Sequence, residues 1–381
     1  MMRITTNSTL YTYQKNLMKS TNQLYSAMRS LMTGRNFDSY SADPAAATRA
    51  FNIHSSLNAT NAQYSNNKTV LGKFSTAWDI ADDMIDKLVS DLAQAPALKG
   101  LNDTNLSTLN TQGDVIYSGA EAVIQSLNSQ YGGNFLFNGA DTKNAPFALE
   151  KDGDRTYVTY RNVRIDDDFD PASPNYNAAY YDADYKDSNG DPILDKDGNP
   201  ISNREALEMF TDGSEHLYVD IGIGFEVDAN GKVVDSTAFD SAISGVDFIG
   251  GAGLDEDGDP KNIVSIMVRL SEVFKDYNVD TNTWGSAGNR DVASRLTEKL
   301  SKAQDALSKQ HTQLDTEAKY LQTNQSQLES TFDSLNTELE GIERVDQVDA
   351  ILALSWAQTS YNAAIQVGSN VIPQSLMDYL N

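Results

Sequence analysis

The sequence predicts a mainly α-helical protein with a β-rich insert, an α+β fold in which N-terminal and C-terminal helices pair into an elongated antiparallel rod. Three observations lead to this prediction. Apolar residues recur every seven positions near both ends, short β-rich runs alternate with turn residues in the middle, and acidic charge is concentrated in the same middle region. A helix with a long seven-residue apolar repeat needs a partner helix along that stripe, and the two ends of one chain can supply it to each other.

The N-terminal region is predicted to form three helical segments. The first has leucines at 10, 17, 24 and 31 and stops at Gly34. Asp43 and Pro44 then supply an N-cap carboxylate and a proline at the first helical position. The second segment repeats every seven residues at Leu57, Tyr64, Leu71, Trp78, Ile85 and Leu92, and we expect Pro96 to end it. A third runs from about 103 to 130.

The middle of the chain is predicted to be a β-rich insert from about 148 to 262. Turn sequences such as Asp197-Gly198 and Asn230-Gly231 separate short runs of β-branched and aromatic residues, which is typical of hairpins. Between Glu150 and Asp280 there are 30 acidic residues and 11 basic ones. We therefore expect this insert to present an acidic, solvated surface.

Helix returns after the insert. Six leucines are spaced seven apart, and a repeat of this length predicts left-handed supercoiling around a partner helix. They are Leu300, Leu307, Leu314, Leu321, Leu328 and Leu335. Gly341 is expected to interrupt this helix, and a last helix is expected from about 345 to 370.

The outermost segments carry few charges, since the first acid is Asp38 and the only charge beyond Ala350 is Asp378. A helix that is neutral on all faces usually has several partners. The predicted domains are 1–40 (N-terminal assembly segment, disordered or helical), 41–147 (N-terminal half of the rod), 148–262 (acidic β-rich domain), 263–344 (C-terminal half of the rod) and 345–381 (C-terminal assembly helix). The predicted assembly residues are Leu10, Leu17, Leu24, Leu31, Leu352, Trp356, Tyr361, Ile365, Leu376 and Leu380; the second-segment repeat and the six leucines are the predicted rod core.

Nothing in the sequence indicates a catalytic centre or a cofactor. His54, His216 and His311 lie in three separate segments, without metal-ligand spacing. The carboxylate groups at 166–168, 195–199 and 255–259 offer oxygen ligands for Ca²⁺, but none has the EF-hand pattern, and we favour Asp-Gly turns. We therefore expect no catalytic, cofactor or metal residues.

Composition excludes several further classes. The net charge of −25 disfavours nucleic acid and anionic lipid as partners. With no cysteine, the chain has no disulfide or thiolate chemistry. No stretch of about 18 apolar residues is present, and Met1 to Lys15 lacks the apolar core of a secretory signal peptide, although an acid-free basic start is also typical of a transit peptide.

Three motifs in order carry a family resemblance. Near the start, 33–36 reads Thr-Gly-Arg-Asn and 41–46 reads Ser-Ala-Asp-Pro-Ala-Ala. The stretch 131–139 reads Tyr-Gly-Gly-Asn-Phe-Leu-Phe-Asn-Gly and is followed by Pro146-Phe147. The far end has Tyr-Asn-Ala-Ala-Ile-Gln-Val at 361–367 and Ser-Leu-Met-Asp-Tyr-Leu at 375–380. With these motifs the chain resembles the hook–filament junction proteins of bacterial flagella (the third hook-associated proteins), members of the flagellin family.

The resemblance covers about 1–147 and 263–381. It implies a flagellin-like fold in which the domain 148–262 faces outward, export by the flagellar type III pathway, and a structural role in motility at the extracellular junction between hook and filament. The implied partners are copies of the chain in a ring, the hook-side junction protein, the filament-side flagellin, and a cytoplasmic export chaperone at the C-terminal helix. The alternatives are a flagellin-type filament subunit, or an enzyme or Ca²⁺ module in 148–262.

Overall fold

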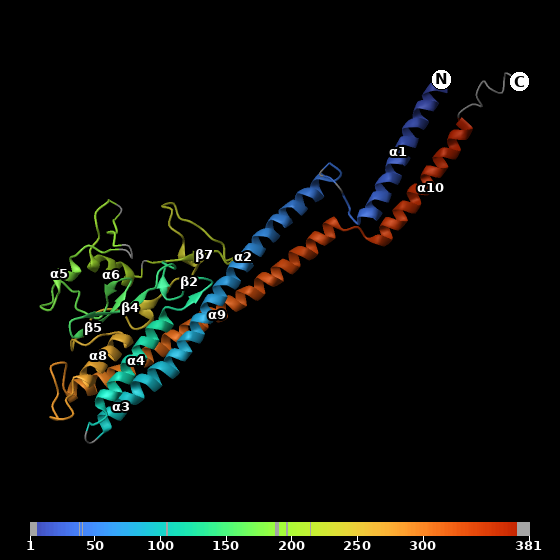
Figure 1. Ribbon diagram of the computed structural model, residues 1–381. Helices are drawn as coiled ribbons and strands as arrows, with labels where there is room; N and C mark the ends of the chain where they lie inside the picture. Colours follow the sequence, from blue (N-terminus) through green and yellow to red (C-terminus); the bar gives the residue numbers. More distant parts are fainter. Residues whose placement is uncertain are drawn as a thin grey trace. The chain divides into compact units, whose positions relative to one another are not determined.

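The computed structural model describes residues 6–37, 39, 41–103, 106–186, 190–195, 197–213 and 215–371. Within this part of the chain the predicted fold class is confirmed. Helices dominate both ends, terminal helices pack antiparallel, and the short strands lie between them in the sequence (Figure 1). None of the described helices combines the length and the apolar character needed to cross a membrane.

The chain divides into two compact units. Residues Met1–Ala62 and Gln327–Asn381 form the first, and Gln63–Ser326 form the second, so that α2 (Pro44–Asp83) and α9 (Arg290–Glu343) contribute to both. Asp43 caps α2 as predicted, because its Oδ1 accepts hydrogen bonds from the backbone N–H groups of Ala45 and Ala46.

The first unit pairs α1 (Thr6–Thr33) with α10 (Gln347–Val371). The links that follow α1 and precede α10 are tied together by backbone hydrogen bonds, from Val345 N to Gly34 O at 3.0 Å and from Asn36 N to Glu343 O at 2.8 Å. Gly34 adopts a φ of +69°, which glycine accommodates at a helix end. Next to these links, an apolar cluster joins the start of α2 to the end of α9; its buried members are Ala50, Ile53, Leu57 and Leu339.

In the second unit the helices run in the order α2, η1 (Met84–Gln94), α3 (Ala95–Asn102), α4 (Leu109–Leu127), α8 (Ile263–Lys275) and α9. Here α2 and α9 are antiparallel. Asn67 meets Leu321, and further along α2 the ring of Trp78 stacks on His311. α4 packs against α8, η1 and α3, around a core that includes Phe74, Met84, Ile116 and Phe274.

The insert contains short antiparallel strands. β4 (Phe147–Asp152), β5 (Arg155–Tyr160) and β6 (Val163–Arg164) form a three-stranded sheet, in which Phe147 is opposite Tyr160 and Asp152 is opposite Arg155. The paired strands β1/β2, β3/β9 and β7/β8 add further two-residue ladders, with β1 Gln130–Tyr131, β2 Asn134–Phe135, β3 Asn138–Gly139, β7 Tyr218–Val219, β8 Phe239–Asp240 and β9 Ile243–Ser244.

Short helices complete the insert: α5 (Ala178–Tyr181), α6 (Asn203–Thr211), η2 (Asp235–Thr237) and α7 (Gly245–Phe248). Ser202 and Glu205 form a reciprocal capping box at the start of α6. Because β3 pairs with β9, the chain leaves and re-enters the helical part of this unit at neighbouring points.

Two predicted helix ends are wrong. The helical run that starts at Pro44 continues through Pro96 to Asn102, because a π-helix, η1, precedes the proline. α9 continues through Gly341 to Glu343, since a single glycine costs a helix only about 1 kcal/mol relative to alanine.

Candidate assembly surface

One face of α1 packs against α10. Leu10, Leu17, Leu24 and Leu31 are half-buried on this face, together with Tyr13 and Ala27. The facing stripe of α10 has the same heptad spacing and is built mainly from small residues: Ala350, Leu354, Ala357, Tyr361, Ala364 and Gly368. Gly368 makes room for the Tyr13 ring, because a β-carbon at this position would overlap the Tyr13 hydroxyl unless the ring moved.

Both helices also carry large apolar side chains that are exposed beside this packed face. On α1, Met32 is 77 % exposed and Tyr11 is 69 % exposed, and Met18, Tyr25 and Met28 are also exposed. On α10, Trp356 is 73 % exposed, and the other exposed apolar residues are Val348, Ile351, Leu352, Ile365 and Val367. Single exposed apolar residues are ordinary, but a concentration of them on two paired helices is typical of an interaction surface.

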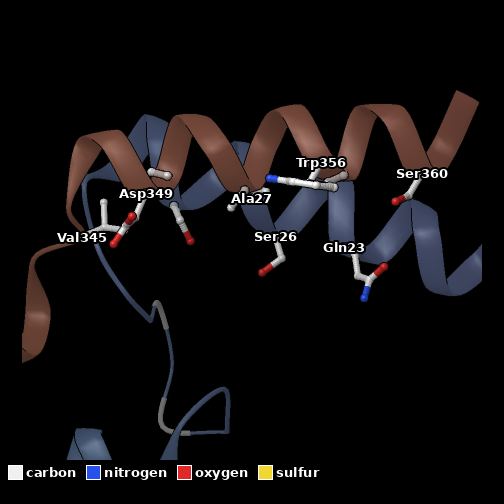
Figure 2. Close-up of a pocket in the computed structure, with 11 residues that line it drawn as sticks. Gln23, Ser26, Ala27, Val345, Asp349, Trp356 and Ser360 are labelled. Atoms are coloured by element: carbon white, nitrogen blue, oxygen red, sulfur yellow. The ribbon is translucent and has the colours of Figure 1, made fainter.

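A groove of about 540 Å³ lies between the two helices. Its walls are mostly small or polar: Gln23, Ser26, Ala27, Ser30, Val345, Asp349, Ala350, Ala353, Trp356, Ala357 and Ser360. Figure 2 shows the Trp356 indole lying lengthwise along α10 at this groove. Asp349 is the only charged residue of α10, and α1 carries only the basic residues Lys15, Lys19 and Arg29. Burying this surface therefore requires little desolvation of charge.

The structure divides the predicted assembly residues into two groups. The four leucines of α1 and Tyr361 are half-buried within the α1–α10 pair, while Leu352, Trp356 and Ile365 are exposed. Leu376 and Leu380 lie outside the described residues. The predicted assembly residues did not include the exposed Tyr11, Met18, Tyr25 and Met32 of α1, although their position directly after each leucine was a signal that could have identified them.

The predicted rod-core residues lie between the paired helices to different depths. Leu57, Leu300, Leu307, Leu314, Leu321 and Leu328 are buried, whereas Tyr64, Leu71, Trp78, Ile85, Leu92 and Leu335 are half-buried. On α2 and at the start of η1 the most buried positions precede the predicted ones by one residue, as at Val70, Ala77 and Met84. The heptad repeats thus located the helices. Which of two neighbouring residues is more deeply buried depends on the packing of α4 and the insert.

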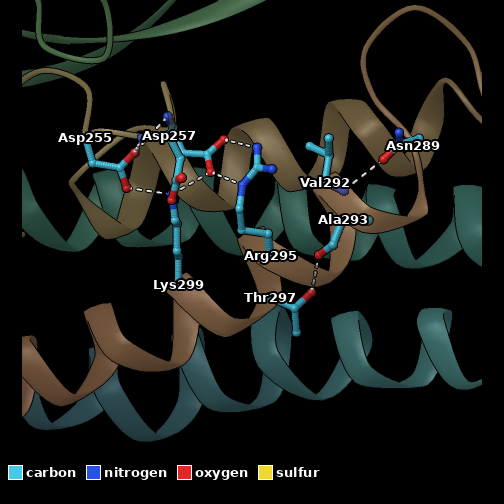
Figure 3. A network of polar contacts seen from close by, with 9 residues as sticks. Asp255, Asp257, Asn289, Val292, Ala293, Arg295, Thr297 and Lys299 are labelled. Atoms are coloured by element: carbon cyan, nitrogen blue, oxygen red, sulfur yellow. Dashed lines mark hydrogen bonds and ion pairs between the residues drawn. The ribbon is translucent and has the colours of Figure 1, made fainter.

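The acidic cluster at 255–259 surrounds a lysine. Lys299 Nζ on α9 lies 2.6 Å from Asp255 Oδ2, 2.8 Å from Asp257 Oδ2 and 2.7 Å from Asp259 Oδ2, and Arg295 pairs with Asp259 (Figure 3). Burial alone would raise the pKa of Asp259, but the hydrogen bonds from Arg295 and Lys299 outweigh it and lower that pKa. A metal ion would have to displace the lysine ammonium from these carboxylates.

The remaining acidic turns have a structural explanation. Asp195 Oδ1 accepts the N–H groups of Asp197 and Asn199, and Asp228 Oδ1 accepts those of Asn230 and Lys232. Asp255 does the same within its own turn. Gly198, Gly231 and Gly258 then take a positive φ. The turns at 195–199 and 255–259 are therefore Asp-Gly turns as predicted, and the turn at 228–232 is an Asn-Gly turn of the same form.

The three histidines do not come together. His54 Nε2 is 2.9 Å from Glu343, His216 Nδ1 is 2.8 Å from Asp240, and His311 stacks on Trp78. Each has a partner in its own surroundings, so they form no shared catalytic or metal site among the described residues.

Comparison with known proteins gives similar solved structures only. No protein-family model and no curated protein matches the chain. It is similar to FlgL from Bacillus cereus, with 13 % identity and a TM-score of 0.40 over 76 % of this chain and 99 % of that one. It is also similar to FlgL from Xanthomonas campestris, with 13 % identity and a TM-score of 0.43 over 76 % and 99 % of the two chains.

Proposed function

We propose that this chain is a structural subunit of the junction between the hook and the filament of the bacterial flagellum, and that it assembles through α1 and α10. The observation that carries the proposal is the apolar surface that this helix pair leaves exposed beside its packed faces. Trp356 on α10 and Met32 on α1 are each more than 70 % exposed although the two helices already bury one face against each other. Removing such surface from water between neighbouring subunits contributes about 25 cal/mol per Å², against which the entropy lost on association must be set.

The lack of charge supports packing on several sides. Neighbouring copies can approach this surface while burying few charged groups, because α10 carries only Asp349 and α1 carries only three basic residues. A ring of copies would place each helix pair between two others. Homo-oligomerisation in a ring is therefore the expected use of this surface.

The three sequence motifs favour the flagellar junction as the assembly. The first leads from the end of α1 into α2, the second spans β1 to β3, and the third begins in α10. Under this proposal the chain is exported by the flagellar type III pathway, a cytoplasmic chaperone holds the C-terminal helix before export, and the acidic insert faces outward. The hook-side junction protein and flagellin are its neighbours in the extracellular structure.

Deleting the gene tests the proposal. The expected phenotype is an intact hook without a filament, with flagellin monomers released into the medium, and normal filaments in the deletion strain would contradict the proposal. Incubating the purified protein alone distinguishes a junction subunit from the alternative, a flagellin-type filament subunit. Growth of long filaments would identify it as a filament subunit instead.

A further inference from the structure

The helical run that begins with α2 changes from an α-helix to a π-helix before it reaches Pro96. Met84–Gln94 is a π-helix of 11 residues between the α-helices α2 and α3. π-Helices are rare and are usually single turns at functional sites. At its end, Ala95 N donates a hydrogen bond to Ser90 O, five residues back instead of four.

The change of form alters which residues face the core. Along α2 the buried residues have α-helical spacing: Val70, Phe74, Ala77, Ala81 and Met84. An α-helix would continue with Leu88, Asp91, Ala95 and Leu98. The structure instead buries Val89, Ala93, Ala97 and Gly100, while Asp91 is exposed and Leu98 is 49 % exposed.

Three residues around the segment favour the π form. In the α register Asp91 would face the core, where a carboxylate without partners is costly. Pro96 has no N–H to donate, and its ring clashes with the carbonyl of Leu92 in an α-helix. Gly119 on α4 leaves room for the displaced backbone, because a β-carbon there would lie 3.0 Å from Leu92 Cβ and 3.2 Å from Leu92 O.

We propose that Met84–Gln94 is a two-register joint, which converts between the π form and an α form and thereby exchanges the residues that η1 and α3 turn toward α4. The α form is sterically ordinary for this sequence apart from Asp91 and Pro96, because leucine, lysine, glutamine and alanine are all good helix formers. Conversion carries Val89 about 140° away from the face marked by Met84, at about 100° per residue, and brings Leu98 onto it. The joint is therefore a bistable element in the core of the second unit.

Cysteine labelling of the full-length chain tests the joint, because the native chain has no cysteine. Val89→Cys and Leu98→Cys are introduced separately as reporters, alone and together with Asp91→Leu and Pro96→Ala. Alone, the reporter at 98 should react quickly with a thiol reagent and the reporter at 89 slowly. With the double change, labelling at 89 should rise at least tenfold and labelling at 98 should fall at least tenfold.

Asp86→Leu is the matched control, since Asp86 is an exposed acid in the same segment and should leave both rates unchanged. Unchanged rates after the double change would overturn the proposal. Faster labelling at both positions would also overturn it, because that pattern means local unfolding. Should the double variant not fold, hydrogen exchange on the unmodified protein decides: amides of 84–94 should exchange at least tenfold faster than those of 70–81, and equal rates would refute the joint.

Discussion

The side chain of Asn67, fully buried on α2, donates a hydrogen bond from Nδ2 to the backbone oxygen of Leu321 on α9 at 2.9 Å. Its Oδ1 accepts a hydrogen bond from Asn324 Nδ2, which also donates to Ile221 O in the insert. A single buried polar residue in an otherwise apolar helix seam fixes the register of the two helices. Here the same network also attaches the insert to the pair.

Asn67→Ala should lower the free energy of unfolding by about 1–3 kcal/mol, because it removes the buried hydrogen bonds that Asn67 makes with Leu321 O and with the Asn324 amide. Urea denaturation followed by circular dichroism measures this change. Asn61→Ala, an exposed asparagine on the same helix, is the control and should stay within about 0.5 kcal/mol of the native value. Equal stability of the two variants would show that the network contributes nothing.

Leu321→Asp should unfold the seam of the second unit. Leu321 is completely buried, and an unpaired carboxylate there costs several kcal/mol, a large part of the stability of a domain. Gln322→Asp is the matched control, because it adds the same charge at the exposed neighbouring position. The midpoint temperature of thermal unfolding should fall steeply for Leu321→Asp and stay unchanged for Gln322→Asp. An unchanged midpoint for Leu321→Asp would mean that the leucine seam is not buried.

The heptads located the paired helices because burying an apolar stripe is a local requirement that the sequence itself records. They could not show which surface covers each stripe. Leu17 and Trp356 are both apolar residues of low-charge helices, yet one faces α10 and the other faces solvent. Pro96 misled the prediction for a different reason, because a π-helix depends on packing against Gly119 of α4, which is distant in sequence. The limits of the predicted domains stay predictions.

Asp166 should make stability depend on pH. It is 2 % exposed, and burial raises its pKa to about 7, although the N–H of Val158 donates to its Oδ2. The folded protein then holds a proton that the unfolded chain releases near pH 4, so this contribution to stability is complete below about pH 4 and is lost as pH rises toward 7. The loss amounts to about 4 kcal/mol over that window.

Asp166→Asn should remove this dependence, since the amide keeps an acceptor for Val158 and does not titrate. Urea denaturation at intervals between pH 4 and pH 8 measures the slope in both proteins. The native protein should lose stability with rising pH more steeply than the variant. If the free energy of unfolding changes with pH equally in both proteins, Asp166 does not cause the pH dependence.

Lys299→Met should allow the 255–259 turn to bind a metal cation. Without the ammonium group, three carboxylates with oxygen atoms within 4.8 Å of one another repel, and Ca²⁺ prefers such oxygen ligands. Calorimetric titration with Ca²⁺ should give no heat of binding with the native protein and measurable binding with the variant. Lys302→Met is the control, because Lys302 is exposed and pairs only with Glu298 among the contacts described. Binding to the native protein would mean that Lys299 does not occupy the site.

Trp356→Asp should abolish assembly while leaving the subunit folded. The indole is 73 % exposed in the isolated chain, so its replacement should change the free energy of unfolding by no more than about 0.5 kcal/mol. In the proposed ring the same position is buried between subunits, where large aromatic residues contribute most of the binding energy and an unpaired carboxylate is costly. Complementation of the deletion strain measures the outcome: Trp356→Phe, the apolar control, should restore filaments and swimming, and Trp356→Asp should not. Full swimming with the Trp356→Asp variant, at normal protein levels, would mean that the assembly surface does not include the exposed Trp356 side of α10.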